Sequence, residues 1–161
     1  MSFVEWLNAS AYATGIRESL IIYPLLQVFH ILGFSLLAGA VTMMNLRVMG
    51  LGRQFSIADG ARYFMPWAWL GFAVVLVTGG NMAISFIEVF AVNTVMHIKL
   101  ILIGIVASHA AVRHYRIHKG LINWDSSGAP ISAKLLAALS VLLWISVITM
   151  GKLLAYIGGK D

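Results

Sequence analysis

Four long apolar runs dominate the chain, and charged residues bound each of them. A transmembrane helix needs about 20 predominantly apolar residues, because each residue advances the helix by about 1.5 Å. The runs meet this length, so we predict an all-α fold, a four-helix transmembrane bundle. The predicted spans are residues 20–46, 64–87, 91–112 and 132–156, and the whole chain, 1–161, is expected to form a single integral membrane domain.

The segment before the first run has a different pattern. Val4, Leu7, Tyr12 and Ile16 recur at helical spacing among polar residues, and no basic start with a continuous apolar block precedes them. Such a pattern is typical of an amphipathic helix that lies in the membrane interface. We therefore predict an N-terminal interfacial amphipathic helix and no cleavable signal peptide.

Composition supports the membrane assignment and excludes several chemistries. Hydrophobic residues make up 60% of the 161 residues and charged residues only 11%, far from the balance of soluble domains. The chain has no cysteine, which excludes disulfides, thiolate metal sites and c-type haem attachment. In a membrane protein the net charge of +5 reflects orientation, so no nucleic-acid partner is expected.

The distribution of cations predicts the orientation. Lys and Arg are concentrated between spans one and two and between spans three and four, whereas the turn between spans two and three has none. The positive-inside rule places both basic loops in the cytoplasm and both termini on the extracytoplasmic side. The cations that carry this prediction are Arg47, Arg53, Arg62, Arg113, Arg116, Lys119 and Lys134.

Ionisable residues inside the apolar runs are the candidate functional groups. His30, His97, Lys99 and His109 all fall within predicted spans, and each costs free energy there unless it faces a cavity, a partner or a cofactor. With the midplane near Leu32 and Ile103, helical rise puts His30 about 3 Å, Lys99 about 6 Å and His97 about 9 Å to the outer side. His109 lies about 9 Å to the cytoplasmic side.

Imidazole chemistry makes His30 and His97 candidate cofactor and metal ligands. Neutral imidazole is an axial ligand of haem iron, and two histidines from different helices can hold one haem b. The competing interpretation is that each histidine is hydrogen-bonded to a neighbouring helix. Lys99 could neutralise a propionate, bind an anionic substrate or exchange a proton, or its chain could extend to the outer headgroups.

Small and polar residues of the other spans fall at the depth of His30. Gly79 and Gly80 are candidate cofactor-binding positions, because small residues let a flat ligand approach the backbone; they also allow tight helix packing. The other members of this polar layer are Gln27, Thr78, Asn81, Ser146 and Thr149.

Three segments carry a resemblance to known families. They are FHILGFSLLAGAVTMMNLRVMGL (Phe29 to Leu51), MHIKLILIGIVASH (Met96 to His109) and ITMGKLLAY (Ile148 to Tyr156). Together they look like an uncharacterised bacterial four-helix integral-membrane family. More distantly, they are similar to the HemJ-type protoporphyrinogen oxidases and to the CopD-type copper-resistance membrane proteins.

The resemblance implies roles for particular residues. In the HemJ-type oxidases a first-helix histidine ligates haem b and a lysine in an H-x-K-L motif is essential. Here those roles would fall on His30 and on Lys99, the latter as the catalytic residue. In that family the first helix ends with an arginine that a proline precedes. Arg47 matches the arginine here, but this chain lacks the proline. The bacterial inner membrane is the location that the resemblance implies.

Our functional expectation combines the polar layer with the resemblance. We expect a haem b-binding membrane protein that acts in electron transfer or in oxidation of a small lipophilic substrate. One alternative is a copper-handling protein that uses His30, His97 and the thioethers of Met43, Met44 or Met82. Another is a non-catalytic subunit of a larger complex. The expected partners are the lipid bilayer and a membrane redox partner or further copies of the chain.

Overall fold

The computed structural model describes residues 2–52, 54 and 56–157, with side chains at all of these except 113–114, 116–123, 125–127, 154–155 and 157. Within these ranges the chain is helical and has no strand. The elements are α1 (Phe3–Asn8), α2 (Ala11–Arg17), α3 (Ile22–Met49), α4 (Ile57–Ser85), α5 (Ile87–Val92), α6 (Thr94–Ser127) and α7 (Ile131–Ile157).

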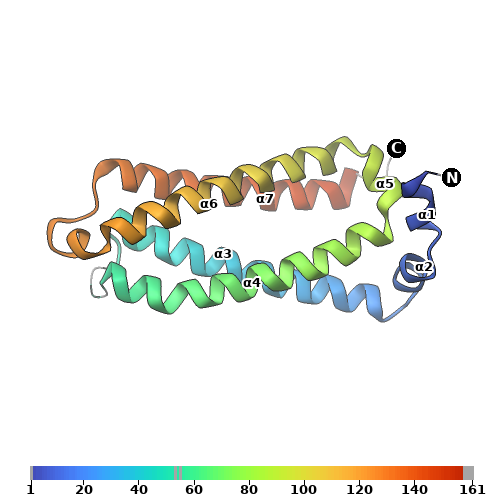
Figure 1. The fold of residues 1–161 in the computed structure, drawn as a ribbon, viewed down its shortest axis with the longest axis horizontal. Coiled ribbons are helices and arrows are strands. Elements are labelled where there is room, and N and C mark those ends of the chain that lie inside the picture. The colour runs from blue at the N-terminus through green and yellow to red at the C-terminus, as the bar shows by residue number, and fades with distance from the viewer. Residues whose placement is uncertain (1, 53, 55, 158–161) are drawn as a thin grey trace.

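Figure 1 shows the four long helices lying side by side along the long axis of the molecule. The short helices α1, α2 and α5 lie at one end, here called the termini end, where α7 also finishes. The connections from α3 to α4 and from α6 to α7 lie at the opposite end, here called the loop end. Of the cations that we assigned to cytoplasmic loops, Arg47, Arg62 and Lys134 lie on helix segments at or near the loop end. Arg53 and the side chains of Arg113, Arg116 and Lys119 lie outside the described residues.

Each of the four long helices contains a stretch long and apolar enough to cross a membrane: Ile22–Met49, Ile57–Ser85, Thr94–Val112 and Ile131–Leu153. The predicted fold class, an all-α bundle of four spanning helices, is confirmed. Side chains along these stretches are mostly exposed on the isolated chain, as expected where lipid replaces water. The protein is therefore a multi-pass membrane protein.

The N-terminal segment forms two short helices where we predicted one. Ser2 and Glu5 form a reciprocal capping box at the start of α1. The hydroxyl of Ser10 accepts a hydrogen bond from the amide of Ala13 at 3.2 Å and starts α2. A serine that caps a new helix competes with continuation of the preceding one, so the segment breaks at Ala9 and Ser10.

The second span begins earlier than predicted. We predicted that the span begins at residue 64, yet α4 starts at Ile57 and also includes Asp59 and Gly60. Ser56 caps it, with its hydroxyl 2.8 Å from the amide of Asp59. That strong start outweighs the helix-breaking tendency of the glycine.

The third span is part of a longer helix. We predicted that the span ends at residue 112, but α6 continues to Ser127 and the break is confined to residues 128–130. Gly128 has φ of +78°, a backbone conformation that favours glycine. The carbonyl of Pro130 then accepts hydrogen bonds from Ala133 and Lys134 at the start of α7.

Helices α3 and α4 are the most extensively packed pair of helices among the described residues and are called here the first hairpin. Helices α6 and α7 form the second hairpin. In the first hairpin Gly33 and Gly71 let the two backbones meet. A Cβ added to Gly71 would lie 2.6 Å from the Gly33 carbonyl oxygen and 2.7 Å from the Leu37 nitrogen. This close approach is typical of small residues at membrane helix interfaces.

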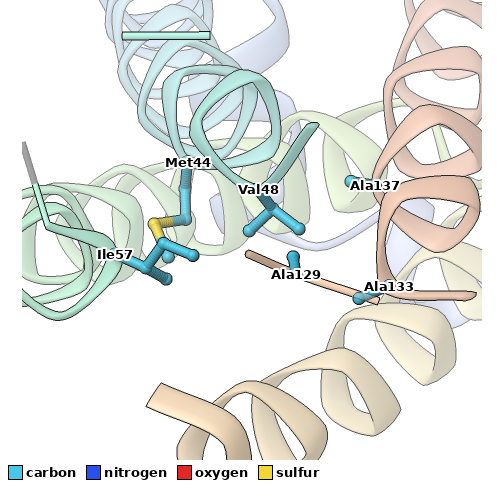
Figure 2. Close-up of a cluster of buried hydrophobic side chains, with 6 residues drawn as sticks. All are labelled: Met44, Val48, Ile57, Ala129, Ala133 and Ala137. Atoms are coloured by element: carbon cyan, nitrogen blue, oxygen red, sulfur yellow. The ribbon is translucent and has the colours of Figure 1, made fainter. Parts of the chain in front are cut away.

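A second contact region lies at the loop end and joins both hairpins. Figure 2 shows Met44 and Val48 of α3, Ile57 of α4 and Ala133 and Ala137 of α7 gathered in one cluster, together with Ala129. Nearer the middle of the bundle, Phe34 packs edge-on against Trp144, with ring centroids 5.6 Å apart. These contacts hold α7 against α3 and leave the termini half of the bundle to be positioned by other residues.

Candidate functional site

His30 extends the packed face of α3. The buried residues Gly33, Leu37, Ala40, Met44 and Val48 follow it at spacings of three and four, which places them on one side of a helix. The imidazole is half-buried and lies against α4. The side chain that we singled out first therefore faces a neighbouring helix and does not project into the lipid.

A threonine of α4 holds the imidazole. The His30 Nδ1 atom lies 2.9 Å from the hydroxyl oxygen of Thr78, and Thr78 is buried. The same hydroxyl lies 2.6 Å from the backbone carbonyl oxygen of Val74. Such a hydrogen bond is what we expect if His30 only joins two helices. It is also the kind of hydrogen bond that orients a histidine which ligates a metal.

The two glycines that we proposed for cofactor binding have different surroundings. A Cβ added to Gly79 would lie 2.8 Å from Cε1 and 3.3 Å from Nδ1 of His30, so Gly79 makes room for the imidazole itself. A Cβ on Gly80 would meet no atom within 4 Å. Gly79 therefore leaves room for the imidazole of His30, whereas Gly80 is exposed on α4.

Helix α6 has one packed face, and Lys99 lies on it. Within Thr94–Val112 the buried or half-buried residues other than Met96 follow spacings of three and four, which define a single stripe. The members of this inward stripe are Val95, Lys99, Leu102, Val106 and His109. Lys99 is therefore directed into the bundle, and the alternative that its side chain reaches outward to the headgroups has less support.

Lys99 is the second ionisable group of this region. Its ammonium lies within electrostatic range of the His30 imidazole, although α3 and α6 do not pack directly against each other. The two groups come from different hairpins, α6 and α3, and lie in the half of the bundle nearer the termini end. This juxtaposition of a histidine and a lysine is the candidate site.

His97 does not join that site. It is exposed, and two residues of helix separate it from Lys99 by a rotation of about 200°. In this structure the side chain of His97 therefore lies on the other face of α6 from Lys99. The pairing of His30 with His97 about one haem stays a prediction.

Most of the predicted polar layer satisfies its hydrogen bonds within its own helix. Ser146 and Thr149 donate to carbonyls four residues earlier, at 3.0 and 2.9 Å. Asn81 donates to the Val77 carbonyl at 2.7 Å and accepts from the hydroxyl of Tyr12. Gln27 is exposed. Only Thr78 of this layer is hydrogen-bonded to His30.

A polar clamp that we did not predict fastens the N-terminal helices above the site. Arg17 donates to the side chain of Asn8 at 2.8 Å and to the Ser85 carbonyl at 2.9 Å. Asn8 in turn donates to Glu88 at 2.7 Å. Ser85 is the last residue of α4, so the guanidinium also faces the negative end of a helix dipole.

Asn45 is a second feature that sequence reasoning missed. Its side chain is fully buried, and neither its nitrogen nor its oxygen has a hydrogen-bond partner among the described residues. An asparagine flanked by Met44 and Leu46 gives no signal of burial, because the direction it faces depends on how α3 packs. His109, on the inward stripe of α6, lies about 15 Å along that helix from Lys99.

Two of the three methionines named for the copper alternative lie away from His30 or face outward. Met44 lies in the loop-end cluster, about 21 Å along α3 from His30, and Met43 is exposed. Within the part of the chain that the structure describes, no three His, Asp or Glu residues are grouped so that they could hold a metal ion.

Comparisons of the chain with protein-family models, with curated proteins and with solved structures find no match. The resemblance to the HemJ-type and CopD-type proteins therefore stays a prediction, and the function has to be argued from the site itself.

Proposed function

We propose that this protein binds one haem b in the half of the bundle nearer the termini end, with His30 as an axial ligand. The observation that carries the proposal is the inward position of His30, whose Nδ1 is tied to Thr78 while Lys99 of another helix lies in electrostatic range. The protein would serve electron transfer or the oxidation of a small lipophilic substrate.

The chemistry of the residues fits this cofactor. Haem iron accepts a neutral imidazole as axial ligand, and a hydrogen bond to the other ring nitrogen is the usual support of such a ligand. When bound, haem b supplies one-electron transfer.

Lys99 has a separate role in the proposal. A haem b carries two carboxylates, and an ammonium directed into an apolar bundle stabilises such a charge by a charge-assisted hydrogen bond. Lys99 would therefore neutralise a carboxylate, either of the cofactor or of a substrate. His97, on the opposite face of α6, has no part in this site.

The orientation belongs to the same proposal. We infer that both termini lie on the extracytoplasmic side of a bacterial inner membrane, since the cations of the loops gather at the other end. The His30–Lys99 site would then open toward the outer leaflet, beneath the clamp formed by Arg17, Asn8 and Glu88. A redox partner would approach from that side.

A second candidate is a non-catalytic subunit in which His30 only joins two helices. The His30–Thr78 hydrogen bond favours it, because that bond alone compensates part of the cost of placing an imidazole in a membrane. Under this hypothesis the protein has a structural role and binds no cofactor.

The experiment is a cofactor assay on the full-length chain, expressed with ample haem precursor and purified in mild detergent. The proposal expects a Soret band and about one haem b per chain by the pyridine haemochrome assay. Copper is measured in the same sample by elemental analysis. Protein that is folded by circular dichroism but carries no haem contradicts the proposal, and folded protein with stoichiometric copper favours the copper alternative.

A further inference from the structure

The hydroxyl of Thr78 has one proton, and the structure indicates where it goes. The oxygen lies 2.6 Å from the Val74 carbonyl oxygen and 3.4 Å from that of Val75. A carbonyl can only accept, so the hydroxyl donates to Val74. The contact of 2.9 Å with His30 is then made by a lone pair of the hydroxyl oxygen, and the proton in that contact belongs to Nδ1.

Because the Thr78 oxygen is the acceptor in this contact with His30, Nδ1 carries the hydrogen. In a neutral imidazole only one nitrogen carries hydrogen, so Nε2 keeps its lone pair.

Thr78 fixes which edge of the ring faces α4. A half-turn of the ring would exchange Nδ1 for a carbon and break the bond to Thr78. Gly79 leaves the room that this orientation needs, because an added Cβ would lie 2.8 Å from Cε1 and 3.3 Å from Nδ1. Thr78 thus selects one orientation of the imidazole.

We propose that Thr78 is a positioning residue that holds His30 as the Nδ1–H tautomer, with the Nε2 lone pair available as a ligand. The inference rests on the proposed function for its purpose, because fixing the Nδ1–H tautomer (here called the tautomer lock) is useful only if Nε2 ligates the haem iron. The orientation itself does not depend on the cofactor and can be tested without it.

The first test is nitrogen NMR of the full chain, labelled with ¹⁵N-histidine, haem-free and in lipid bilayers, with His30→Ala used to assign the His30 signals. We expect the proton on Nδ1 and a bare Nε2. In Thr78→Val the hydroxyl is lost at nearly constant shape, and we expect the neutral ring to populate both tautomers. A proton on Nε2 of His30 in the wild-type protein overturns the proposal.

The second test measures haem affinity in three threonine variants. Loss of the group that orients a ligating histidine typically weakens binding about 10- to 100-fold, and we expect this for Thr78→Val. Thr78→Ser keeps the hydroxyl and should stay within about threefold of wild type. Thr149→Val is the matched control, because Thr149 makes the same bond to the carbonyl four residues earlier and is exposed on α7.

The two tests separate the two claims. If wild-type protein binds no haem while His30 carries its proton on Nδ1, the proposed function fails and the role of Thr78 as a tautomer lock stands. If haem binds and Thr78→Val weakens it no more than Thr149→Val does, Thr78 is not a positioning residue.

Discussion

In the first hairpin, two glycines bring the backbones of α3 and α4 into direct contact, whereas α6 exposes most of the side chains in its spanning stretch. The first hairpin also carries the polar clamp from Arg17 and the histidine site. Helix α6 contributes one inward stripe, on which Lys99 lies. The difference indicates that α3 and α4 form the rigid frame of the site, and that α6 supplies a charge to it while depending on lipid for most of its contacts.

The largest effect is expected where the frame is tightest. In Gly71→Ala the added methyl group meets the Gly33 carbonyl and the Leu37 nitrogen at under 3 Å, so the helices must separate. We expect a loss of about 2–3 kcal/mol in the free energy of unfolding, measured by denaturation in detergent. In Gly104→Ala on α6, where an added Cβ meets nothing within 4 Å, we expect no loss. Equal destabilisation of both variants would remove the distinction between the two regions.

The next effect concerns two neighbouring glycines of α4. Gly79→Ala forces the imidazole of His30 away from Thr78, because the new methyl group would overlap Cε1. We expect haem affinity to fall about tenfold or more, as measured by haem titration. Gly80→Ala adds a methyl group to open space and serves as the control. If Gly80→Ala weakens haem binding as much as Gly79→Ala does, the glycine beside the histidine has no special role.

The charge from α6 is tested by its influence on redox potential. A nearby cation favours the reduced form of an iron centre, since reduction lowers the positive charge there. Removing it in Lys99→Gln should therefore lower the midpoint potential of the bound haem, by roughly several tens of millivolts. Lys152, exposed and lying over the Tyr156 ring, gives the control Lys152→Gln. An unchanged or raised potential in Lys99→Gln would place the ammonium away from the iron.

The smallest effect is expected at the clamp on the first hairpin. Arg17→Ala removes the hydrogen bonds of a half-buried guanidinium to Asn8, to Thr14 and to the Ser85 carbonyl at the end of α4. We expect a local loss of about 1 kcal/mol, seen as faster proteolysis within residues 2–21 at an unchanged global unfolding midpoint. The exposed Arg62 on α4 provides the control variant. If the N-terminal helices are cleaved at the wild-type rate, the clamp does not fasten them.

The spans were predictable because apolar runs bounded by charges have one main explanation, a helix that crosses a membrane. Their ends were less predictable. Asp59 and Gly60 read as breakers, and only the cap at Ser56 shows that α4 includes them. The N-terminal segment reads as one helix until Ser10 is seen to start a second one.

The site was predictable in its residue types and not in its geometry. The sequence shows both His30 and His97 as imidazoles inside predicted spans, and the helical rise per residue gives an estimate of the depth of each in the membrane. Which way each side chain faces depends on the rotation of its helix, and that rotation follows from packing. For α3 the packing is set by Gly33 and Gly71. Because the spanning stretch of α6, Thr94–Val112, is predominantly apolar around the helix, no amphipathic pattern distinguishes the face of Lys99 from that of His97.

The contrast between the two histidines tests the central claim most directly. The measurement is the absorbance spectrum of the wild-type protein, His30→Ala and His97→Ala, each purified as the folded full chain after expression with ample haem. If His30 is the ligand, the Soret band is present in the wild type and in His97→Ala and absent from His30→Ala. A band that survives in His30→Ala, or that is lost only in His97→Ala, would contradict the account.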